Sequence, residues 1–383
     1  MYIEQDIQDL RSELLEIRRI IHQNPETGFE EYKTSEYIKK KLREYGIDEV
    51  HQIAKTGIVG YLRGCVGDKT TAFRSDMDGL PVKEENNVPY KSVKEGFMHA
   101  CGHDGHMATL LGFAKYAVTH RDQIKDNLVF VFQPAEEGPG GAEVMISEGI
   151  IEAYKIDRII GMHIFPEYTQ GKIACRSGAL MARNGEVDIR VIGKKAHGAM
   201  PDKGIDAIVA AASLITEYQS IMSRSINPLD SAVLTFGKIQ GGEAKNVIAD
   251  DVTIGGTMRA FSDDVYDRIV ERICEIAKGI EKIYGCHIDI EFNHMYRVVE
   301  NDETLEKALR RAVGTENYIA SEQFMISEDF SLFQKMVPGV FFFLGSYNLE
   351  KGYIHPLHSS KFNFDEDILL NGIQTYVNLL NEI

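Results

Sequence analysis

The sequence has no long hydrophobic run and no excess of basic residues. Lys and Arg total 42 against 58 Asp and Glu, which gives a formal net charge of −16. No apolar stretch approaches the roughly 20 residues that span a bilayer, so no transmembrane helix is expected. A negative field repels nucleic-acid phosphates and anionic lipid headgroups. The composition therefore favours a small-molecule or cationic partner, with no nucleic acid and no membrane involved.

Cysteine is scarce as well, and the chain starts with MYIEQDIQDL, which lacks the basic and apolar regions of a secretory signal. The five cysteines are odd in number and dispersed, which argues against a disulfide framework. We therefore expect a cytoplasmic protein. Four cysteines are expected to be small buried hydrophobic residues, namely Cys65, Cys175, Cys274 and Cys286. Cys101 differs because histidines surround it.

A chain of 383 residues exceeds the usual size of one hydrophobic core, which predicts two structural units. In the first part, apolar strand-like runs alternate with helical ones, which predicts an α/β unit with a mixed, mostly parallel sheet. The helices are expected over residues 6–24, 34–46 and 108–120, and the strands over 58–64, 70–78, 127–133 and 158–166.

The middle of the chain has a different pattern. From about residue 184 the order is strand, helix, strand, strand, helix, strand, which is typical of a ferredoxin-like α+β unit. We expect this unit to be an insertion over residues 184–295. The first domain would then be discontinuous, comprising residues 1–183 and 296–383.

Candidate functional residues follow several of the predicted strands. In α/β sheets, sites form outside the carboxyl ends of the strands. Five residues lie at or just past such an end, namely Asp76, Asp78, Glu136, Glu137 and His163. Separate stretches of sequence therefore point to one edge of the sheet.

The segment HACGHDGH, residues 99–106, concentrates possible metal ligands. Cys101 and His103, separated by one glycine, can converge on one ion, and thiolate with imidazole suits zinc and similar metals. His99 and His106 are expected to be polar surface or helix-capping residues. Further ligand types occur in QPAEEG, in GMH and in PLHSS near the end of the chain.

The adjacent glutamates of QPAEEG can take different tasks. If one binds a metal ion, its neighbour can act as general base toward a metal-bound water. A solvated turn is the alternative, but the pair follows the strand LVFVFQ and precedes the glycine-rich GPGGA, which favours function. In DMD, Asp76 and Asp78 lie on the same side of an extended segment, where an acid can orient a metal ligand from behind.

Together, nine motifs resemble the metal-dependent aminoacylase and carboxypeptidase family, in its amidohydrolase branch. This branch includes auxin-conjugate hydrolases, hippurate hydrolases and N-acetyldiaminopimelate deacetylases. The motifs occur in the family's order and cover nearly the whole chain: RSDMDGLPV, MHACGHDGHMATLLG, FQPAEEGPGGA, GMHIFP, KKAHGAMPDKGIDAI, GGEAKNVIAD, GTMRAF, SEDF and PLHSSKFN.

The resemblance implies a zinc-peptidase-like catalytic domain with two divalent metal ions, and a ferredoxin-like lid that usually forms a homodimer. Manganese or zinc is expected, with cobalt or nickel as alternatives. Glu136 would be the base and Asp78 the acid behind the ligands, whereas Asp76 stands where the wider family has a histidine ligand. Cysteine replaces the aspartate that bridges the metals in many members. The implied ligands are Cys101, His103, Glu137, His163 and His358.

The same resemblance assigns three residues of the lid. His197 matches a histidine that reaches the partner subunit's active site and stabilises the oxyanion; a capping histidine in a loop is the alternative. Asn246 and Arg259 match positions that hold the substrate carboxylate, and the planar fork of arginine suits that task. For Arg259 the alternative is a surface charge at a strand edge.

The implied activity is hydrolysis of the amide bond of an N-acyl amino acid, by attack of a metal-bound water that Glu136 activates. The products would be a carboxylic acid and a free amino acid. An aminopeptidase or dipeptidase of the same type and a non-catalytic metal-binding protein remain alternatives. A nucleophilic Cys101 is disfavoured, because a thiolate held by metal is a poor nucleophile. The motifs do not specify the acyl group or the amino-acid side chain.

Overall fold

The computed structural model describes residues 1–383, which divide into two compact units. Unit 1 comprises residues 1–178, 300–322 and 329–383, and unit 2 comprises residues 179–299 and 323–328. The short segment 323–328 was expected in the first domain. It joins unit 2 because its carbonyl groups, those of Phe324 and Ile326, accept hydrogen bonds from the backbone N–H of Ala182. No helix combines the length and the hydropathy that a membrane crossing requires.

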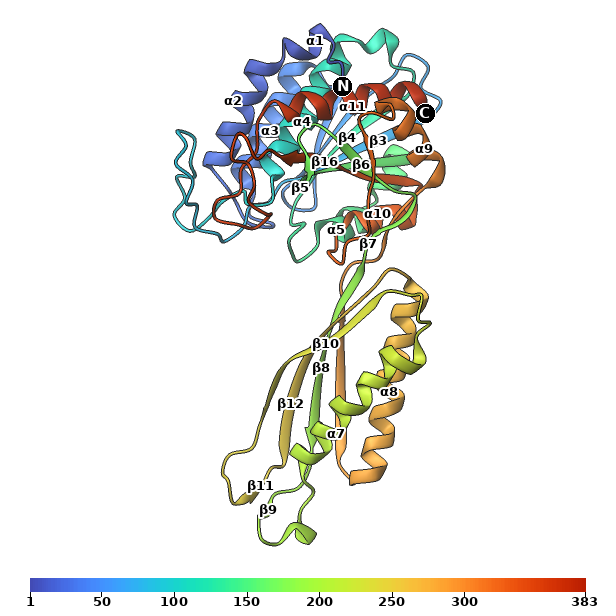
Figure 1. Ribbon diagram of the computed structural model, residues 1–383. Helices are drawn as coiled ribbons and strands as arrows, with labels where there is room; N and C mark the ends of the chain where they lie inside the picture. Colours follow the sequence, from blue (N-terminus) through green and yellow to red (C-terminus); the bar gives the residue numbers. More distant parts are fainter. The chain divides into compact units, whose positions relative to one another are not determined.

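Unit 1 is built around a mixed eight-stranded sheet with the order β1-β2-β4-β3-β5-β16-β6-β15 (Figure 1). The four strands β4, β3, β5 and β16 are parallel neighbours, and antiparallel pairs lie toward both edges. The predicted mixed sheet is therefore confirmed. The strands are β1 (Glu49–Ile53), β2 (Gly57–Leu62), β3 (Thr70–Asp76), β4 (Asn127–Gln133), β5 (Arg158–Thr169), β6 (Ile173–Cys175), β15 (Tyr318–Ala320) and β16 (Gly339–Tyr347).

Helices cover both faces of this sheet. Phe341 of β16 packs against Phe330 at a ring distance of 5.1 Å, whereas Phe342 packs against Tyr376 at 6.1 Å, because successive strand residues point to opposite faces. The first face carries α10 (Phe330–Met336) and α5 (Gly141–Ser147), with α6 (Ile150–Tyr154) following in the chain. The second face carries α2 (Arg11–Gln23), α3 (Tyr32–Tyr45), α4 (His103–Thr119), α9 (Glu303–Val313) and α11 (Ile368–Glu382), preceded by the single turn α1 (Gln5–Gln8).

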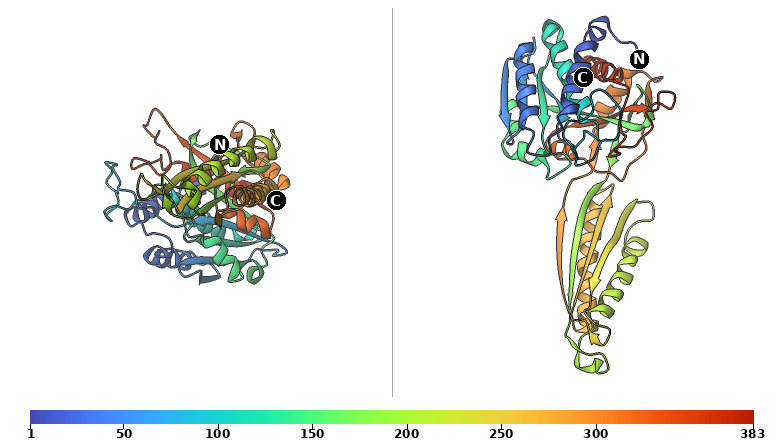
Figure 2. Two further views of the ribbon diagram at one scale, coloured as in Figure 1. Left: turned by 90° about the horizontal axis from the view of Figure 1, so that it is seen from below. Right: turned by 90° about the vertical axis from the view of Figure 1, so that its left-hand side faces the viewer.

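Unit 2 has the ferredoxin-like order of elements. Its sheet has the order β10-β12-β8-β13 with every pair antiparallel, and two helices cover one face around a separate core (Figure 2). Asp206 and Ser262 cap the two helices by accepting backbone N–H groups. The elements are β8 (Arg183–Ile192), α7 (Ala207–Ser220), β10 (Ala232–Gly241), β12 (Asp251–Ala260), α8 (Asp263–Tyr284) and β13 (His287–His294).

A small two-stranded sheet and two connecting strands complete the fold. The small sheet pairs β9 (Ala196–His197) with β11 (Val247–Ile248), antiparallel, within unit 2. The chain passes between the units through β7 (Gly178–Met181) and β14 (Val299–Asn301).

The cysteines differ from the expectation in part. Cys175 and Cys286 are buried, but Cys65 is exposed and Cys274 is only partly buried. The reason for Cys65 is local, because it follows the end of β2 in a turn rather than continuing the strand. All five cysteines are free.

Candidate metal centre

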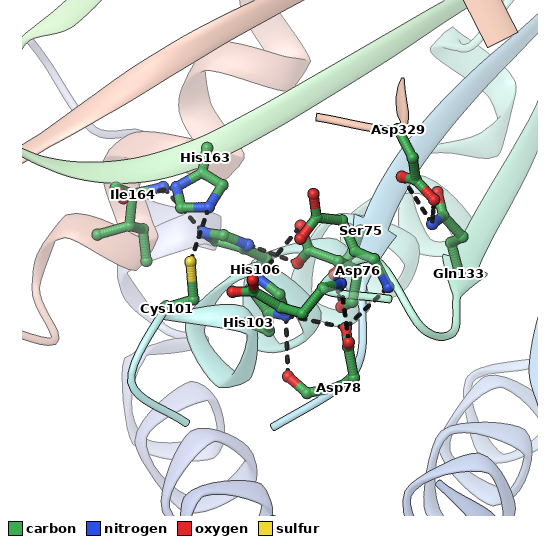
Figure 3. A network of polar contacts seen from close by, with 12 residues as sticks. Ser75, Asp76, Asp78, Cys101, His103, His106, Gln133, His163, Ile164 and Asp329 are labelled. Atoms are coloured by element: carbon green, nitrogen blue, oxygen red, sulfur yellow. Dashed lines mark hydrogen bonds and ion pairs between the residues drawn. The ribbon is translucent and has the colours of Figure 1, made fainter. Parts of the chain in front are cut away.

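Cys101 lies at the centre of the predicted site, in the loop before α4. Its Sγ is 3.4 Å from Nε2 of His163 on β5 and 3.3 Å from Nε2 of His358 (Figure 3 shows the first contact). The backbone N–H of His358 donates to the carbonyl of Ala100 at 2.8 Å, which fixes the two loops side by side. His358 has a φ of +64°, a left-handed conformation that non-glycine residues rarely adopt and that is concentrated at functional sites.

His103 and Glu137 complete the set of five predicted ligands. His103 is buried in the first turn of α4, and its Nδ1 donates to the carbonyl of Asp78 at 2.9 Å. One ring nitrogen of His103 lies within 4.8 Å of a carboxylate oxygen of Glu136 and of Glu137. Oε1 of Glu137 is 2.8 Å from Nε2 of His358. The structure thus brings all five predicted ligands and the predicted base together.

A tight turn after β4 places the two glutamates. The carboxylate of Asp78 accepts the backbone N–H groups of Glu136 at 3.2 Å and Glu137 at 3.0 Å. The turn then folds back so closely that a Cβ on Gly141 would lie 1.8 Å from the carbonyl oxygen of Pro134. Glycine is therefore required there, which explains the GPGGA sequence after the glutamate pair.

The charges around the site favour a cation. Burial raises the pKa of the Cys101 thiol, and the neighbouring carboxylates raise it further. Although burial opposes the charged form, Asp76 and Asp78 raise the pKa of His103 to about 10. Positive charge is therefore stabilised at this ring, and a metal ion would supply it in place of the second proton. Burial also holds the pKa of His163 well below its ordinary value, which keeps that ring neutral as a metal ligand must be. A thiol with a raised pKa does not fit an activated nucleophile.

The donor set fits a divalent metal ion. Nε2 of His103 is a buried atom without a hydrogen-bond partner, and it lies 3.7 Å from Oδ2 of Asp76. Imidazole nitrogen, thiolate sulfur and carboxylate oxygen are the ligands of zinc and neighbouring metals. A bound cation would satisfy this nitrogen and balance the buried carboxylates.

His99 and His106 were expected at the surface or as helix caps, and this prediction is wrong. Both are buried, at 1 % exposure each. The reason is that α4 begins at His103, which turns His106 inward one helical turn later. His106 contacts Asp76, whereas neither ring nitrogen of His99 has a partner, and burial lowers the pKa of His99 to about 3. The spacing of three between His103 and His106 was the available signal.

A buried ionic network next to the site was not predicted. Arg74 of β3 is fully buried, and its three guanidinium nitrogens contact Asp76, Asp329 and Gln133 at 2.9, 2.9 and 2.8 Å. Gln133 also donates to Asp329 at 2.7 Å. An arginine inside a strand of a sheet expected to be covered on both faces was the signal, since a buried charge requires buried partners.

The three predicted residues of unit 2 do not come together within it. His197 and Asn246 are neighbours, because His197 pairs with Val247 and the N–H of Gly198 donates to the carbonyl of Asn246. Arg259 lies near the other end of β12, about 26 Å from the start of that strand at roughly 3.3 Å per residue. Its Nη1 donates to the carbonyl of Met325 at 2.9 Å.

Comparison with known proteins identifies the class of this protein. Residues 72–382 match the model of peptidase family M20/M25/M40, and the chain belongs to that family. It is accordingly a hydrolase of amide bonds.

Relatives of similar length narrow the comparison. The chain is 40% identical over 369 residues to an N-acetyldiaminopimelate deacetylase of Exiguobacterium sibiricum, covering 96% of this chain and 97% of the relative. It is 41% identical to the protein of the same name from Anoxybacillus flavithermus, covering 94% of each. Among solved structures, a dinuclear metal binding peptidase of the M20 family from Bacillus subtilis has a TM-score of 0.86 at 30% identity, covering 97% of this chain and 98% of that one.

Proposed function

We propose that the protein hydrolyses the amide bond of N-acyl amino acids with the help of two divalent metal ions, releasing a carboxylic acid and a free amino acid. The observation that carries this proposal is the convergence of five potential metal ligands around Cys101, with Glu136 beside them. The convergence joins segments more than 250 residues apart in the chain, as the contact between Cys101 and His358 illustrates.

The metal ligands would be Cys101, His103, Glu137, His163 and His358. Cys101 would be the central ligand of this set, because its Sγ contacts Nε2 of both His163 and His358. Manganese or zinc fits this donor set, with cobalt or nickel as alternatives. When bound, such ions polarise a carbonyl group and lower the pKa of water toward neutrality.

The protein side chains would move the protons. Glu136 takes a proton from the water that attacks the amide carbon, and it returns that proton to the amine nitrogen as the C–N bond breaks. Asp78 holds the backbone of Glu136 and Glu137 through two N–H groups and keeps the base in place. One water molecule is consumed for each amide bond broken.

N-acetyldiaminopimelate is the first substrate to test. Relatives about 40% identical over nearly the whole chain are named for its deacetylation. A deacetylase would release acetate and a diamino dicarboxylic acid from this compound. Hippurate and indole-acetyl conjugates are the N-acyl amino acids to compare with it.

Unit 2 would act as a lid and as the contact between two subunits of a homodimer. One copy of the unit separates Arg259 from His197 and Asn246 along β12, so a single lid does not gather the three groups around one substrate. If a second subunit supplied His197 and Asn246, all three groups could reach the same substrate. His197 would then stabilise the oxyanion, while Asn246 and Arg259 would bind the substrate carboxylate.

The experiment is hydrolysis of a substrate panel by metal-stripped protein resupplied with manganese, zinc, cobalt or nickel. The panel contains the three N-acyl amino acids above and a set of dipeptides with a free amine. Metal-dependent release of amino acid from the acylated compounds supports the proposal. Preference for dipeptides would favour the aminopeptidase alternative, and bound metal without any turnover would favour the non-catalytic one.

A further inference from the structure

Four buried side chains beside Cys101 look like a complete metal site of their own. They are Asp76, His103, His106 and His163, and their ligand atoms all lie within 4.8 Å of one another. Four ligands of this kind suffice for a tetrahedral metal ion. Their hydrogen bonds, however, divide them into two pairs with different tasks.

His106 has no nitrogen lone pair available for a metal. Its Nε2 lies 2.8 Å from the backbone nitrogen of Ile164, which can only donate, so Nε2 is the acceptor. In the neutral ring the proton is then on Nδ1, which lies 2.6 Å from Oδ1 of Asp76. Both nitrogens of His106 are therefore used within the protein.

Both carboxylate oxygens of Asp76 are likewise used in hydrogen bonds within the protein. Oδ1 accepts from His106, and Oδ2 accepts from Nη1 of Arg74 at 2.9 Å. A metal ion at Oδ2 would lie against a fully buried guanidinium group, whose charge repels it. Because Arg74 also contacts Gln133 and Asp329, it cannot move away without breaking further buried contacts.

The other two histidines are arranged differently. His103 and His163 each use Nδ1 toward a backbone carbonyl, that of Asp78 at 2.9 Å and that of Ile164 at 2.7 Å. Neither Nε2 is therefore used by a backbone group, and Nε2 of His163 points at Cys101 (Figure 3). Ile164 links the two kinds of histidine, since its N–H binds His106 and its carbonyl binds His163.

We propose that Asp76 and His106 are positioning residues rather than metal ligands, and that they act through the backbone of Ile164 to hold the ring of His163 in its metal-binding orientation. The chain of contacts runs Asp76, His106, Ile164, His163 without a gap. This inference rests on the proposed function insofar as that function places metal ions at Cys101 and His163.

The test is a Co²⁺ titration of metal-free protein, with the bound Co²⁺ counted by elemental analysis and thiolate coordination followed by near-ultraviolet charge-transfer absorption. His106→Leu removes the acceptor for Ile164, whereas His106→Gln keeps a side-chain carbonyl there. His163→Ala is the benchmark for loss of a ligand. His99→Leu is the matched control, because His99 is equally buried in the same segment but has no partner.

A positioning role predicts that His106→Leu binds as many Co²⁺ ions at saturation as the unchanged protein, with affinity reduced by about 10- to 100-fold. His106→Gln should lose less Co²⁺ affinity than His106→Leu, and His99→Leu should lose none. Thermal unfolding of the metal-free variants checks that they fold; if the leucine variant does not, His106→Gln carries the test with a smaller affinity loss at full stoichiometry.

Two outcomes would overturn the inference while leaving the proposed function intact. Loss of bound Co²⁺ in His106→Leu equal to that in His163→Ala would make His106 a ligand. Unchanged affinity and absorption in both His106 variants would deny it any role at the site. If the unchanged protein bound no Co²⁺, the proposed metal centre itself would fail, and this inference with it.

Discussion

The carboxylate of Asp78 accepts a hydrogen bond from the backbone N–H of Glu137 at 3.0 Å. The same carboxylate accepts the N–H of Glu136 at 3.2 Å, and its Oδ1 lies 3.2 Å from Nδ1 of His103. One buried side chain therefore connects the turn that carries both glutamates to the helix that carries His103. The positions of the proposed base and of two proposed metal ligands depend on it.

Asp78→Asn should weaken the site without unfolding the protein. Asparagine keeps one acceptor oxygen, but its NH₂ group would face a backbone N–H. We expect a loss of about 10- to 100-fold in metal affinity or in activity, the range for groups that orient metal ligands. Mn²⁺ binding and kcat/KM measure it, with the exposed Asp122→Asn as control. Equal values for both variants would contradict the role given to Asp78.

Glu136→Gln separates the chemical step from metal binding. Glutamine has the same shape but cannot take a proton from water. We expect kcat to fall by about 10²- to 10⁴-fold, the contribution of a general base, while the number of bound metal ions stays the same. Glu143→Gln, at an exposed position of α5, is the control. Retained turnover would exclude Glu136 as the base, and loss of bound metal would make it a ligand instead.

The sequence predicted the location of those site residues that directly follow a strand, because residue type and strand position are enough to place them. Asp76 ends β3, and the two glutamates follow β4 within four residues, so the rule for parallel strands locates them at one edge. His163 was expected at a strand end, but β5 continues to Thr169 because its pairing with β16 does. The ligand set around Cys101 came from motif resemblance, which supplied the distant His358.

Residue type does not distinguish ligands from the residues that hold them. His103 and His106 lie three apart on one helix, yet one binds the carbonyl of Asp78 and the other the N–H of Ile164. One partner lies two residues after the end of β3 and the other lies in β5, so the difference depends on tertiary structure. For the same reason, the separation of Arg259 from His197 could not be predicted from matching motifs one by one.

Arg18→Ala should destabilise unit 1 strongly. Nε of Arg18 lies 2.7 Å from Oδ2 of Asp104, and both side chains are almost completely buried. Removing the arginine breaks a buried ion pair and leaves the Asp104 carboxylate with His22 as its remaining charged neighbour. Breaking such a pair costs about 3–5 kcal/mol. Arg19→Ala is the matched control, because Arg19 is 43% exposed and its ion pair with Glu366 is worth about 1 kcal/mol or less. Urea denaturation measures the free energy of unfolding of both variants. An equal loss in the two would contradict the prediction.

The stabilisation by this pair should also depend on pH. Although burial opposes the charged form, Arg18 and His22 lower the pKa of Asp104 below its unfolded value of about 3.9. A carboxyl group with a depressed folded pKa contributes its full stability above the unfolded pKa and loses it as the pH falls toward the folded one. The difference in unfolding free energy between the unchanged protein and Arg18→Ala should therefore narrow below about pH 4. A constant difference across the acid range would contradict the charge-based explanation.

A hybrid dimer tests whether His197 serves the partner subunit. His197 is exposed on β9 and lies far along unit 2 from Arg259, so its variants should keep their metal ions while losing activity. Chains carrying His197→Ala and chains carrying Glu136→Gln are co-expressed with different tags, and the dimer holding one of each is isolated. If His197 acts across the interface, one of the hybrid dimer's two active sites has both an intact Glu136 and an intact His197. About half of the wild-type activity should then return. The control dimer pairs His197→Ala with a chain carrying both substitutions, in which no site is complete. Activity no higher in the hybrid than in this control would show that His197 works within its own chain or not at all.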